Sequence, residues 1–256
     1  MKRIMLVVAY DGTNYCGWQI QPNGITVEEV LNRHLSDLLK ESITVIGASR
    51  TDSGVHAIGN VAVFDTETKI PGEKISFALN QRLPRDIVIQ QSREVPGDFH
   101  PRFCNSRKTY QYRILNSRFP LPTQRLYTHF VYYPLLAEAM SEAAKYLIGE
   151  HDFKSFCSTR TQVTDTIRTI YDINVEKSGE MIQITISGNG FLYNMVRIIV
   201  GTLIKVGLGI YPPNHVLEIL NKRDRLVAGP KAPAQGLTLL KVDYPDLDAL
   251  TVNGWN

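Results

Sequence analysis

Residues 26–39 read TVEEVLNRHLSDLL and predict an amphipathic helix. Thr26 and Glu29 form a capping box, in which the Thr26 hydroxyl and the Glu29 carboxylate satisfy free backbone N–H groups at the start of a helix. Apolar residues then recur every three or four positions along one side, from Val27 to Leu39. That spacing is typical of a helix with one buried face, so we expect the helix to run to about Lys40.

The segments on either side of this helix predict strands. Residues 3–10 form a short apolar run rich in β-formers that stops at Asp11-Gly12. The elements expected after the helix are strands over 43–48 and 58–65, a helix over 73–79 and a strand over 86–91. The first part of the chain therefore has the order β-α-β-β-α-β.

The rest of the chain is expected to repeat that order. Its elements are a strand over 108–115, a helix over 135–148, a hairpin of strands 167–176 and 181–187, helices over 192–206 and 214–220, and a strand over 237–242. Two such units predict an α+β fold of two pseudo-repeated, ferredoxin-like or RRM-like halves, with antiparallel sheets side by side and a central basic cleft. We expect two α/β domains, 1–105 and 106–256, the first of which carries the loop with Asp52.

The composition is that of an ordinary globular protein. Of the 256 residues, 43% are hydrophobic and 21% charged, which excludes collagenous, coiled-coil and disordered classes. No apolar run approaches the roughly 18 residues of a membrane-spanning helix. Cys16, Cys104 and Cys157 have no C-x-x-C spacing, which argues against a disulfide framework and a zinc knuckle. These features predict reduced thiols and a cytoplasmic protein.

Positive charge is concentrated in the middle of the chain, although the net charge is only +3. Residues 99–137 contain no Asp or Glu. The basic residues of this stretch are Arg102, Arg107, Lys108, Arg113, Arg118 and Arg125, and nine aromatic residues lie among them. Cations that neutralise phosphates and rings that stack on bases together indicate a structured RNA partner. On composition alone, a solvated basic face above an aromatic core is the favoured alternative.

One polar loop could carry chemistry. Residues 47–57 read GASRTDSGVHA and lie between two apolar strands. On spacing alone, the favoured interpretation is a tight turn in which Asp52 bonds nearby backbone N–H groups. The alternative is a functional site, because Arg50, Asp52 and His56 are crowded at the end of a strand. A carboxylate beside a guanidinium stays ionised and can act as a nucleophile or a general base.

Seven motifs in order resemble those of the tRNA pseudouridine synthase A family. They are YDGTNYCGWQ (10–19), GASRTDSGVHA (47–57), DFHPRF (98–103), KTYQY (108–112), GEHDFKSF (149–156), FLYNMVRIIVG (191–201) and APAQGL (232–237). The chain departs from the family pattern at Ser49, Ser53 and Pro101, none of which removes a group that could carry charge. The resemblance spans nearly the whole chain.

The resemblance implies that a uridine of tRNA is detached from its ribose at N1 and rejoined through C5, without cofactor, metal or redox change. It makes Asp52 the catalytic carboxylate, which attacks either the ribose C1′ or the uracil ring. Arg197 would pair with Asp52, and Tyr110 would stack on the base and carry a proton. Leu237 would close the other face of the base, and Arg50 would fill the space that the flipped base leaves.

Plainer interpretations of these residues also fit the sequence. Arg197 on its own reads as a surface charge on a helix, although its neighbours are apolar. Tyr110 and Leu237 read as core residues. His56 has the family position, and we expect it to stabilise the turn rather than to take part in the reaction.

The resemblance also implies the partners: the anticodon stem-loop of tRNA, with positions 38, 39 and 40 as targets, and a second copy in a homodimer. Two other functions fit the sequence less well. A catalytically silent RNA-binding protein has no use for a carboxylate that faces phosphates. An Asp/His hydrolase of small molecules would need a nucleophile elbow, an H-E-x-x-H motif or a P-loop, and the sequence has none.

Overall fold

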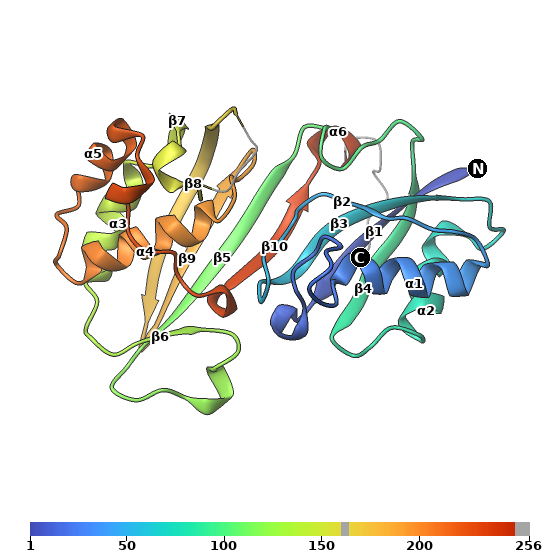
Figure 1. Cartoon of the computed structure of the whole chain (residues 1–256), viewed down its shortest axis with the longest axis horizontal. Coiled ribbons are helices and arrows are strands. Elements are labelled where there is room, and N and C mark those ends of the chain that lie inside the picture. The colour runs from blue at the N-terminus through green and yellow to red at the C-terminus, as the bar shows by residue number, and fades with distance from the viewer. Residues whose placement is uncertain (160–163, 249–256) are drawn as a thin grey trace. The chain divides into compact units, whose positions relative to one another are not determined.

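The computed structural model describes residues 1–159 and 164–248, and it confirms the expected α+β class (Figure 1). By its contacts the chain divides into two compact units. The first unit contains Met1–Ser106 and the residues from Leu239 onward, and the second contains Arg107–Thr238. The expected domain division at residue 105 remains a prediction. It assigned the residues from Leu239 onward to the second half, whereas the contacts assign them to the first unit. Each unit is described by itself below.

The sheet of the first unit has the strand order β4-β1-β3-β10. Its members are β1 (Lys2–Tyr10), β3 (His56–Thr66), β4 (Ile87–Val95) and β10 (Leu237–Asp243). β1 pairs antiparallel with β3 on one side and with β4 on the other. The apolar run at the start of the chain is therefore a central, largely buried strand.

Two helices complete the core of the first unit. In α1 (Val27–Leu39), the Glu29 N–H donates to Thr26 Oγ1 at 3.3 Å, as the capping motif predicted. α2 (Ile75–Asn80) packs against β4 and contacts α1. It begins later than expected because Gly72–Lys74 forms a 3₁₀ turn. A four-residue helix, α6 (Pro245–Asp248), follows β10.

The expected strand over 43–48 is the clearest correction in this unit. Only β2 (Ile46–Gly47) pairs, with Val63 and Ala62 of β3. The backbone before it is bonded to side chains of α1 instead. The Ile43 N–H donates to Ser36 Oγ at 2.9 Å, and the Val45 N–H donates to Asn32 Oδ1 at 2.8 Å.

The sheet of the second unit has the order β5-β9-β8-β7, with the short strand β6 (His129–Val131) parallel to β5. Its longer members are β5 (Arg107–Asn116), β7 (Gly149–Asp152), β8 (Ile167–Ser178) and β9 (Met181–Gly188). β8 and β9 form the expected hairpin, in which Gly179 has a φ of +58°. β6 and β7 were not expected, so a strict repeat of the first unit's order is not confirmed.

The helices described in the second unit are α3 (Ala137–Lys145), α4 (Met195–Gly207) and α5 (His215–Lys222). α3 packs against β8, α4 and α5, and it is shorter than expected because residues 146–148 leave the helix in turns. In α4 every residue except Ile204 and Lys205 is buried. Its one charged buried residue is Arg197, a candidate of the sequence analysis.

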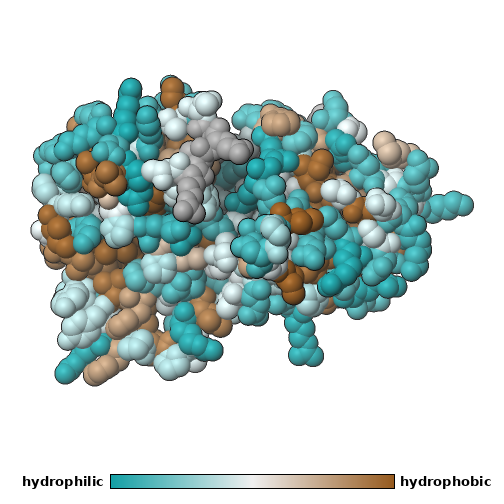
Figure 2. All heavy atoms as spheres, in the orientation of Figure 1, coloured by the Kyte–Doolittle hydropathy of each residue, from teal (hydrophilic) through white to brown (hydrophobic). Residues whose placement is uncertain are grey.

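The surface carries exposed apolar side chains. Figure 2 shows a largely hydrophilic face on which hydrophobic residues form small groups. Phe103, Phe119, Tyr133 and Leu226 are all well exposed. Within residues 1–159 and 164–248, no helix is long and apolar enough to cross a membrane.

Gly201 gives a test of how tightly α4 is packed. Alanine is favoured over glycine in a helix by roughly 1 kcal/mol. A Cβ at residue 201 would, however, lie 1.7 Å from the carbonyl oxygen of Pro230. Gly201→Ala is therefore expected to lower the free energy of unfolding by about 1–3 kcal/mol, as overpacking does. Denaturant unfolding measures this loss.

Lys205→Ala in the same helix is the control, and its unfolding free energy should stay within about 0.5 kcal/mol of the wild type. A Gly201→Ala protein as stable as the wild type would show that the 228–232 segment yields without cost.

Candidate active site

The loop between β2 and β3 carries Arg50 and Asp52, two residues apart. The Ala48 N–H donates to the Val61 carbonyl at 2.7 Å, and the Val55 N–H donates to the Asp52 carbonyl at 3.1 Å. The turn at Asp52 is thus closed by the main chain. Burial alternates along the loop: Arg50 is exposed, Thr51 is buried and Asp52 is half-buried. Arg50 and Asp52 are therefore the more accessible side chains on either side of a buried threonine.

The segment after β1 supports this loop along its length. The Trp18 N–H donates to the Thr51 carbonyl at 3.0 Å, and the Gly54 N–H donates to the Tyr15 carbonyl at 3.3 Å. Ser53 Oγ donates to the same Tyr15 carbonyl at 3.2 Å. The two motifs YDGTNYCGWQ and GASRTDSGVHA thus form one structural element.

Two glycines allow the segment to come this close. A Cβ at Gly12 would lie 2.0 Å from the Val55 carbonyl oxygen. Gly17 has a φ of +85°, and a Cβ there would lie 2.5 Å from the Thr51 carbonyl oxygen. No other residue fits either position without moving the loop.

A buried polar network beneath the loop was missed by the sequence analysis. Asn60 of β3 is fully buried, and its side chain is hydrogen-bonded to both backbone groups of Ser49. Asn60 Oδ1 accepts from the Ser49 N–H at 3.3 Å, and Asn60 Nδ2 donates to the Ser49 carbonyl at 3.1 Å. Tyr10 Oη lies 2.7 Å from Thr51 Oγ1 and 3.4 Å from Asn60 Nδ2. The signal in the sequence is an asparagine inside the apolar strand HAIGNVAVFDT. Such a residue must find partners when it is buried.

His56 lies where its ring can stabilise the turn. It is buried, and its Nδ1 accepts from the Gly12 N–H at 3.1 Å and lies 3.1 Å from Asp11 Oδ1. These contacts tie β3 to the turn that follows β1. They support the structural role that the sequence analysis favoured.

Tyr110, Arg197 and Leu237 belong to the second unit. Tyr110 in β5 is 8% exposed, pairs with Ile186 of β9, and meets Phe191 edge to face at 5.2 Å between ring centroids. This burial agrees with a core tyrosine, and its stacking on a base stays a prediction. Leu237 is buried at the start of β10.

Arg197 is not a surface charge, so that interpretation is wrong. It is 8% exposed, its Nε donates to the Ala232 carbonyl at 2.8 Å, and its Nη1 donates to Asn194 Oδ1 at 3.1 Å. The Ala232 N–H returns a bond to the Arg197 carbonyl at 3.0 Å. These contacts fix the plane of the guanidinium and tie α4 to the turn before Leu237.

Tyr112 supports the same turn from β5. Its hydroxyl donates to the Pro233 carbonyl at 2.8 Å. Burial raises the pKa of Tyr112 above its usual range, and the positive charge of Arg197 opposes this rise. A Cβ at Gly236 would lie 2.6 Å from the Tyr112 ring, so the APAQGL motif packs directly on this tyrosine.

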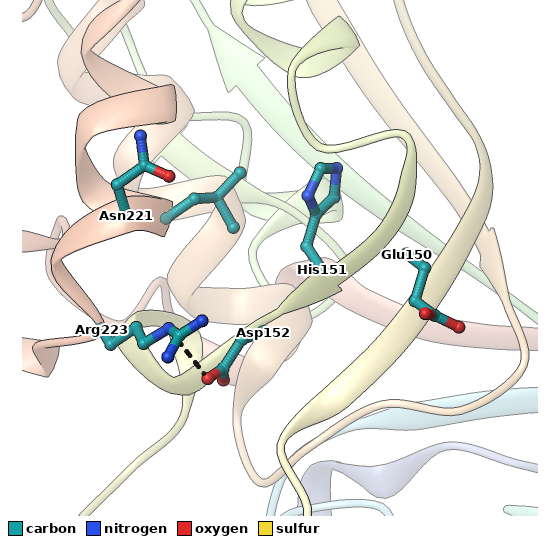
Figure 3. Close-up of a pocket in the computed structure, with 6 residues that line it drawn as sticks. Glu150, His151, Asp152, Asn221 and Arg223 are labelled. Carbon is teal, nitrogen blue, oxygen red and sulfur yellow. Dashed lines mark ion pairs between the residues drawn. The ribbon is translucent and has the colours of Figure 1, made fainter.

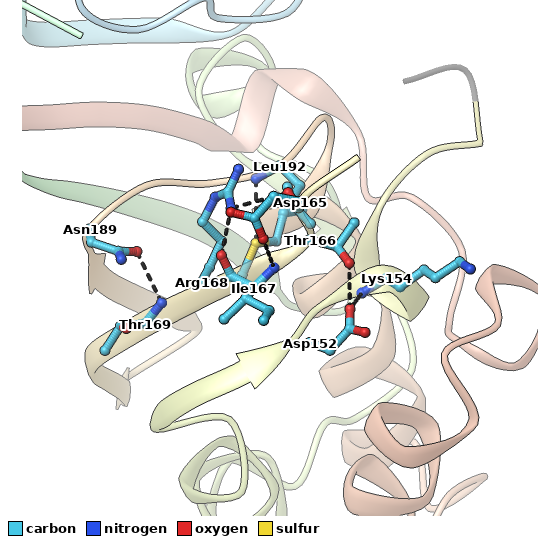
Figure 4. Close-up of polar contacts among 10 residues, drawn as sticks. Asp152, Lys154, Asp165, Thr166, Ile167, Arg168, Thr169, Asn189 and Leu192 are labelled. Carbon is cyan, nitrogen blue, oxygen red and sulfur yellow. Dashed lines mark hydrogen bonds and ion pairs between the residues drawn. The ribbon is translucent and has the colours of Figure 1, made fainter. Parts of the chain in front are cut away.

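Polar contacts also fix the chain that leads into α4 (Figure 4). The Thr169 N–H donates to Asn189 Oδ1 at 3.0 Å, which fastens the loop after β9 to β8. Asp152 accepts from the Lys154 N–H at 3.1 Å and from the Thr166 hydroxyl, which fastens β7 to the start of β8. The GEHDFKSF motif thereby has a structural function.

A cavity of about 330 Å³ lies beside the GEHDFKSF motif, and Figure 3 shows the residues that line it. The residues that line it are Glu150, His151, Asp152, Leu220, Asn221 and Arg223. None of them is a predicted site residue. Arg223 Nε lies 3.2 Å from Asp152 Oδ2, so the Asp152 carboxylate is already paired there.

The structure thus brings Arg50 and Asp52 together in the first unit, and Arg197, Tyr112 and the 232–237 turn together in the second. The expected ion pair between Asp52 and Arg197 joins residues of different units and stays a prediction.

Comparison with known proteins identifies what the chain is similar to. Residues 6–104 and 143–245 match the family described as tRNA pseudouridine synthase. Proteins named tRNA pseudouridine synthase A are 52% identical in Thermoanaerobacter sp. (strain X514) and 49% identical in Brevibacillus brevis. Both alignments cover 95% of this chain and all of the relative. Clostridium perfringens has a 47% identical protein named tRNA pseudouridine synthase A 2, with the same coverage.

Asn60→Ala tests the network under the loop. Removal of the amide leaves the buried backbone groups of Ser49 without their partner, which costs roughly 1–3 kcal/mol. We expect that loss in denaturant unfolding, together with faster hydrogen exchange of the Ser49 amide.

Asn80→Ala is a matched control, because the Asn80 side chain grips both backbone groups of Ile89 at 2.9 and 2.8 Å. It should cost a similar stability and leave exchange at Ser49 unchanged. Equal protection of Ser49 in both variants would show that Asn60 does not hold the loop.

Proposed function

This chain belongs to the tRNA pseudouridine synthase family, and we propose that its substrate is the anticodon stem-loop of tRNA, with uridines 38, 39 and 40 as targets. Members of this family are isomerases. The coarse activity, conversion of uridine to pseudouridine in tRNA, follows from the family. The resemblance of the seven motifs supports the proposed target positions.

We assign the reaction itself to Asp52. The N1–C1′ bond breaks, a C5–C1′ bond forms, the proton of C5 is lost and N1 gains one, so product and substrate are isomers. A carboxylate can serve either by bonding to C1′ or by adding to the uracil ring. The observation that carries the assignment is the support of its loop by two glycine contacts and by Asn60, since a reactive group must be held in place.

The second unit supplies the other proposed roles. We assign to Arg197 the pairing with the Asp52 carboxylate, and the bonds of Arg197 to Ala232 and Asn194 fix its guanidinium in advance. Tyr110 stacks on the uracil and carries a proton at C5. Leu237, which follows the turn held by Tyr112, covers the other face of the base.

Arg50 completes the proposal. A stacked uridine is out of reach of a carboxylate, so the base must be flipped at a cost of a few kcal/mol. The exposed guanidinium of Arg50 is planar and can fill the vacated space between bases while bonding a phosphate.

A homodimer in the cytoplasm is the remaining part of the proposal. The basic residues between Arg102 and Arg125 extend over more chain than one active site requires, which supports contact of tRNA with two subunits. The rival function is RNA binding without catalysis. A protein with that function would not need a loop that holds Asp52 in place.

Asp52→Asn tests the assigned reaction. The amide keeps the shape of the side chain but cannot act as an anionic nucleophile or base. Pseudouridine formation in an unmodified tRNA transcript is expected to fall by several orders of magnitude. Affinity for tRNA should hold or rise slightly, because one negative charge near the phosphates is removed.

Asp37→Asn, an exposed aspartate of α1, is the control and should turn over at the wild-type rate. If folded Asp52→Asn keeps a tenth of wild-type turnover, a loss of only about 1.4 kcal/mol, the assignment of Asp52 is wrong.

The pairing of Arg197 with Asp52 predicts non-additive losses. Arg197→Ala should lose much of the single-turnover rate, and the double variant should be little slower than Asp52→Asn alone, because the two groups act as one unit. Unfolding curves of each variant separate this loss from loss of the bonds to Ala232 and Asn194. Multiplied losses in the double variant would show that the two residues act independently.

A further inference from the structure

The DFHPRF motif forms a compact turn between β4 and β5. The proposed mechanism gives this turn no role. The N–H groups of Phe103 and Cys104 both donate to the His100 carbonyl at 3.1 Å. The Arg102 N–H donates to the ring nitrogen Nδ1 of His100 at 3.2 Å. His100 thus organises the three residues that follow it.

The turn is anchored to the core of the first unit. Phe99 is buried and meets Tyr244 edge to face at 5.0 Å between centroids. The buried Tyr244 hydroxyl donates to the Pro101 carbonyl at 2.6 Å, and Arg3 Nη1 donates to the Phe99 carbonyl at 3.0 Å. Burial raises the pKa of Tyr244, so the hydroxyl keeps its proton and remains a donor.

The turn carries two stacked rings, those of His100 and Phe103, which form an aromatic platform. The Phe103 ring is 83% exposed and stacks on the His100 ring, with 4.1 Å between centroids and 20° between planes. The stack holds the phenyl ring in one orientation with a face open to solvent. A flat ring presented in this way suits an unstacked nucleic-acid base, because every base has a π-face.

Arg102 directly precedes Phe103 in the chain, and it interacts electrostatically with Arg50. Burial and the positive charge of Arg50 lower the pKa of Arg102, and Glu28 opposes the shift. Glu28 is itself engaged, since its carboxylate accepts from the Ile20 N–H at 2.9 Å. In the part of the chain that the structure describes, neither the Arg50 nor the Arg102 side chain has an ion pair or hydrogen bond. Two cations that repel each other and have no acidic partner favour an anion that contacts both.

We propose that the His100–Phe103 turn is a second nucleotide-binding site, in which the base of an unstacked RNA nucleotide lies on Phe103 and a phosphate lies between Arg102 and Arg50. The platform and the two guanidiniums match the two chemical parts of a nucleotide. The proposal rests on the proposed function in one respect: Arg50 lies next to Asp52, which makes this nucleotide a near neighbour of the target uridine.

The first test removes the ring. Binding of unmodified tRNA transcript is measured in the Asp52→Asn background, where it is separated from turnover. Phe103→Ala should weaken binding by about 5- to 100-fold, the loss of one stacked base, with an unchanged dependence on salt. Phe103→Trp should restore binding. Thermal unfolding should not change, because the ring is exposed.

Phe77→Ala is the matched control, since Phe77 is also an exposed phenylalanine of the first unit beside a cation, Lys74. It should bind as well as the background protein. Unaltered binding by Phe103→Ala, or an equal loss in Phe77→Ala, overturns the stacking site.

The second test removes the charge. Arg102→Ala should reduce the slope of log affinity against log salt by about 0.7 to 0.9, the contribution of one phosphate contact. Arg82→Ala, an exposed arginine after α2, should leave the slope unchanged. An unchanged slope for Arg102→Ala overturns the phosphate site. Residual pseudouridine formation by Asp52→Asn would disprove the catalytic assignment only, because affinity and salt slope are read independently of turnover.

Discussion

The candidate site depends on the close approach of Gly12 and Gly17 to the backbone of the loop that carries Asp52. At both positions a side chain would occupy the place of a carbonyl oxygen, so the loop and the segment after β1 cannot separate without loss of their hydrogen bonds. Trp18 fills the space over Gly47 in the same way, because a Cβ there would overlap the indole. Arg50 and Asp52, the accessible groups of the loop, therefore project from backbone that the segment after β1 holds in place. Fixed donors and acceptors react without a cost for rearrangement, which is the physical value of this arrangement.

The sequence predicted the elements with strong periodicity and missed those held by side chains. The capping motif, the apolar strands and the helix around Arg197 all lie within a few residues of their expected places. The strand over 43–48 was overestimated because Ser36 and Asn32 replace its pairing partners, which no local pattern reveals. The three-residue β6 and the polar β7 are too short or too hydrophilic to show alternation. Asn60 was overlooked since its partners, Ser49 and Tyr10, come from two other segments.

The arginines show why residue type alone could not assign the site. Arg197 lies in an apolar helix and has its guanidinium fixed by Ala232 and Asn194, so its burial is compensated. Arg50 and Arg102 are exposed and have no such bonds among the residues that the structure describes. A buried, bonded arginine keeps one orientation, whereas an exposed one can follow a phosphate. The three residues therefore suit different tasks.

The strand β10 has a consequence for the order in which the protein is made. It completes the first unit's sheet beside β3, yet the whole of the second unit is synthesised between them. β2 pairs with Val63 and Ala62 of β3, but until β10 is synthesised the part of the β3 edge that β10 covers is unpaired, which is a site for mispairing with other chains. Tyr244, which anchors the turn below Phe103, arrives equally late. Each nascent chain should therefore acquire this hydrogen bond to the Pro101 carbonyl only after the second unit has been made.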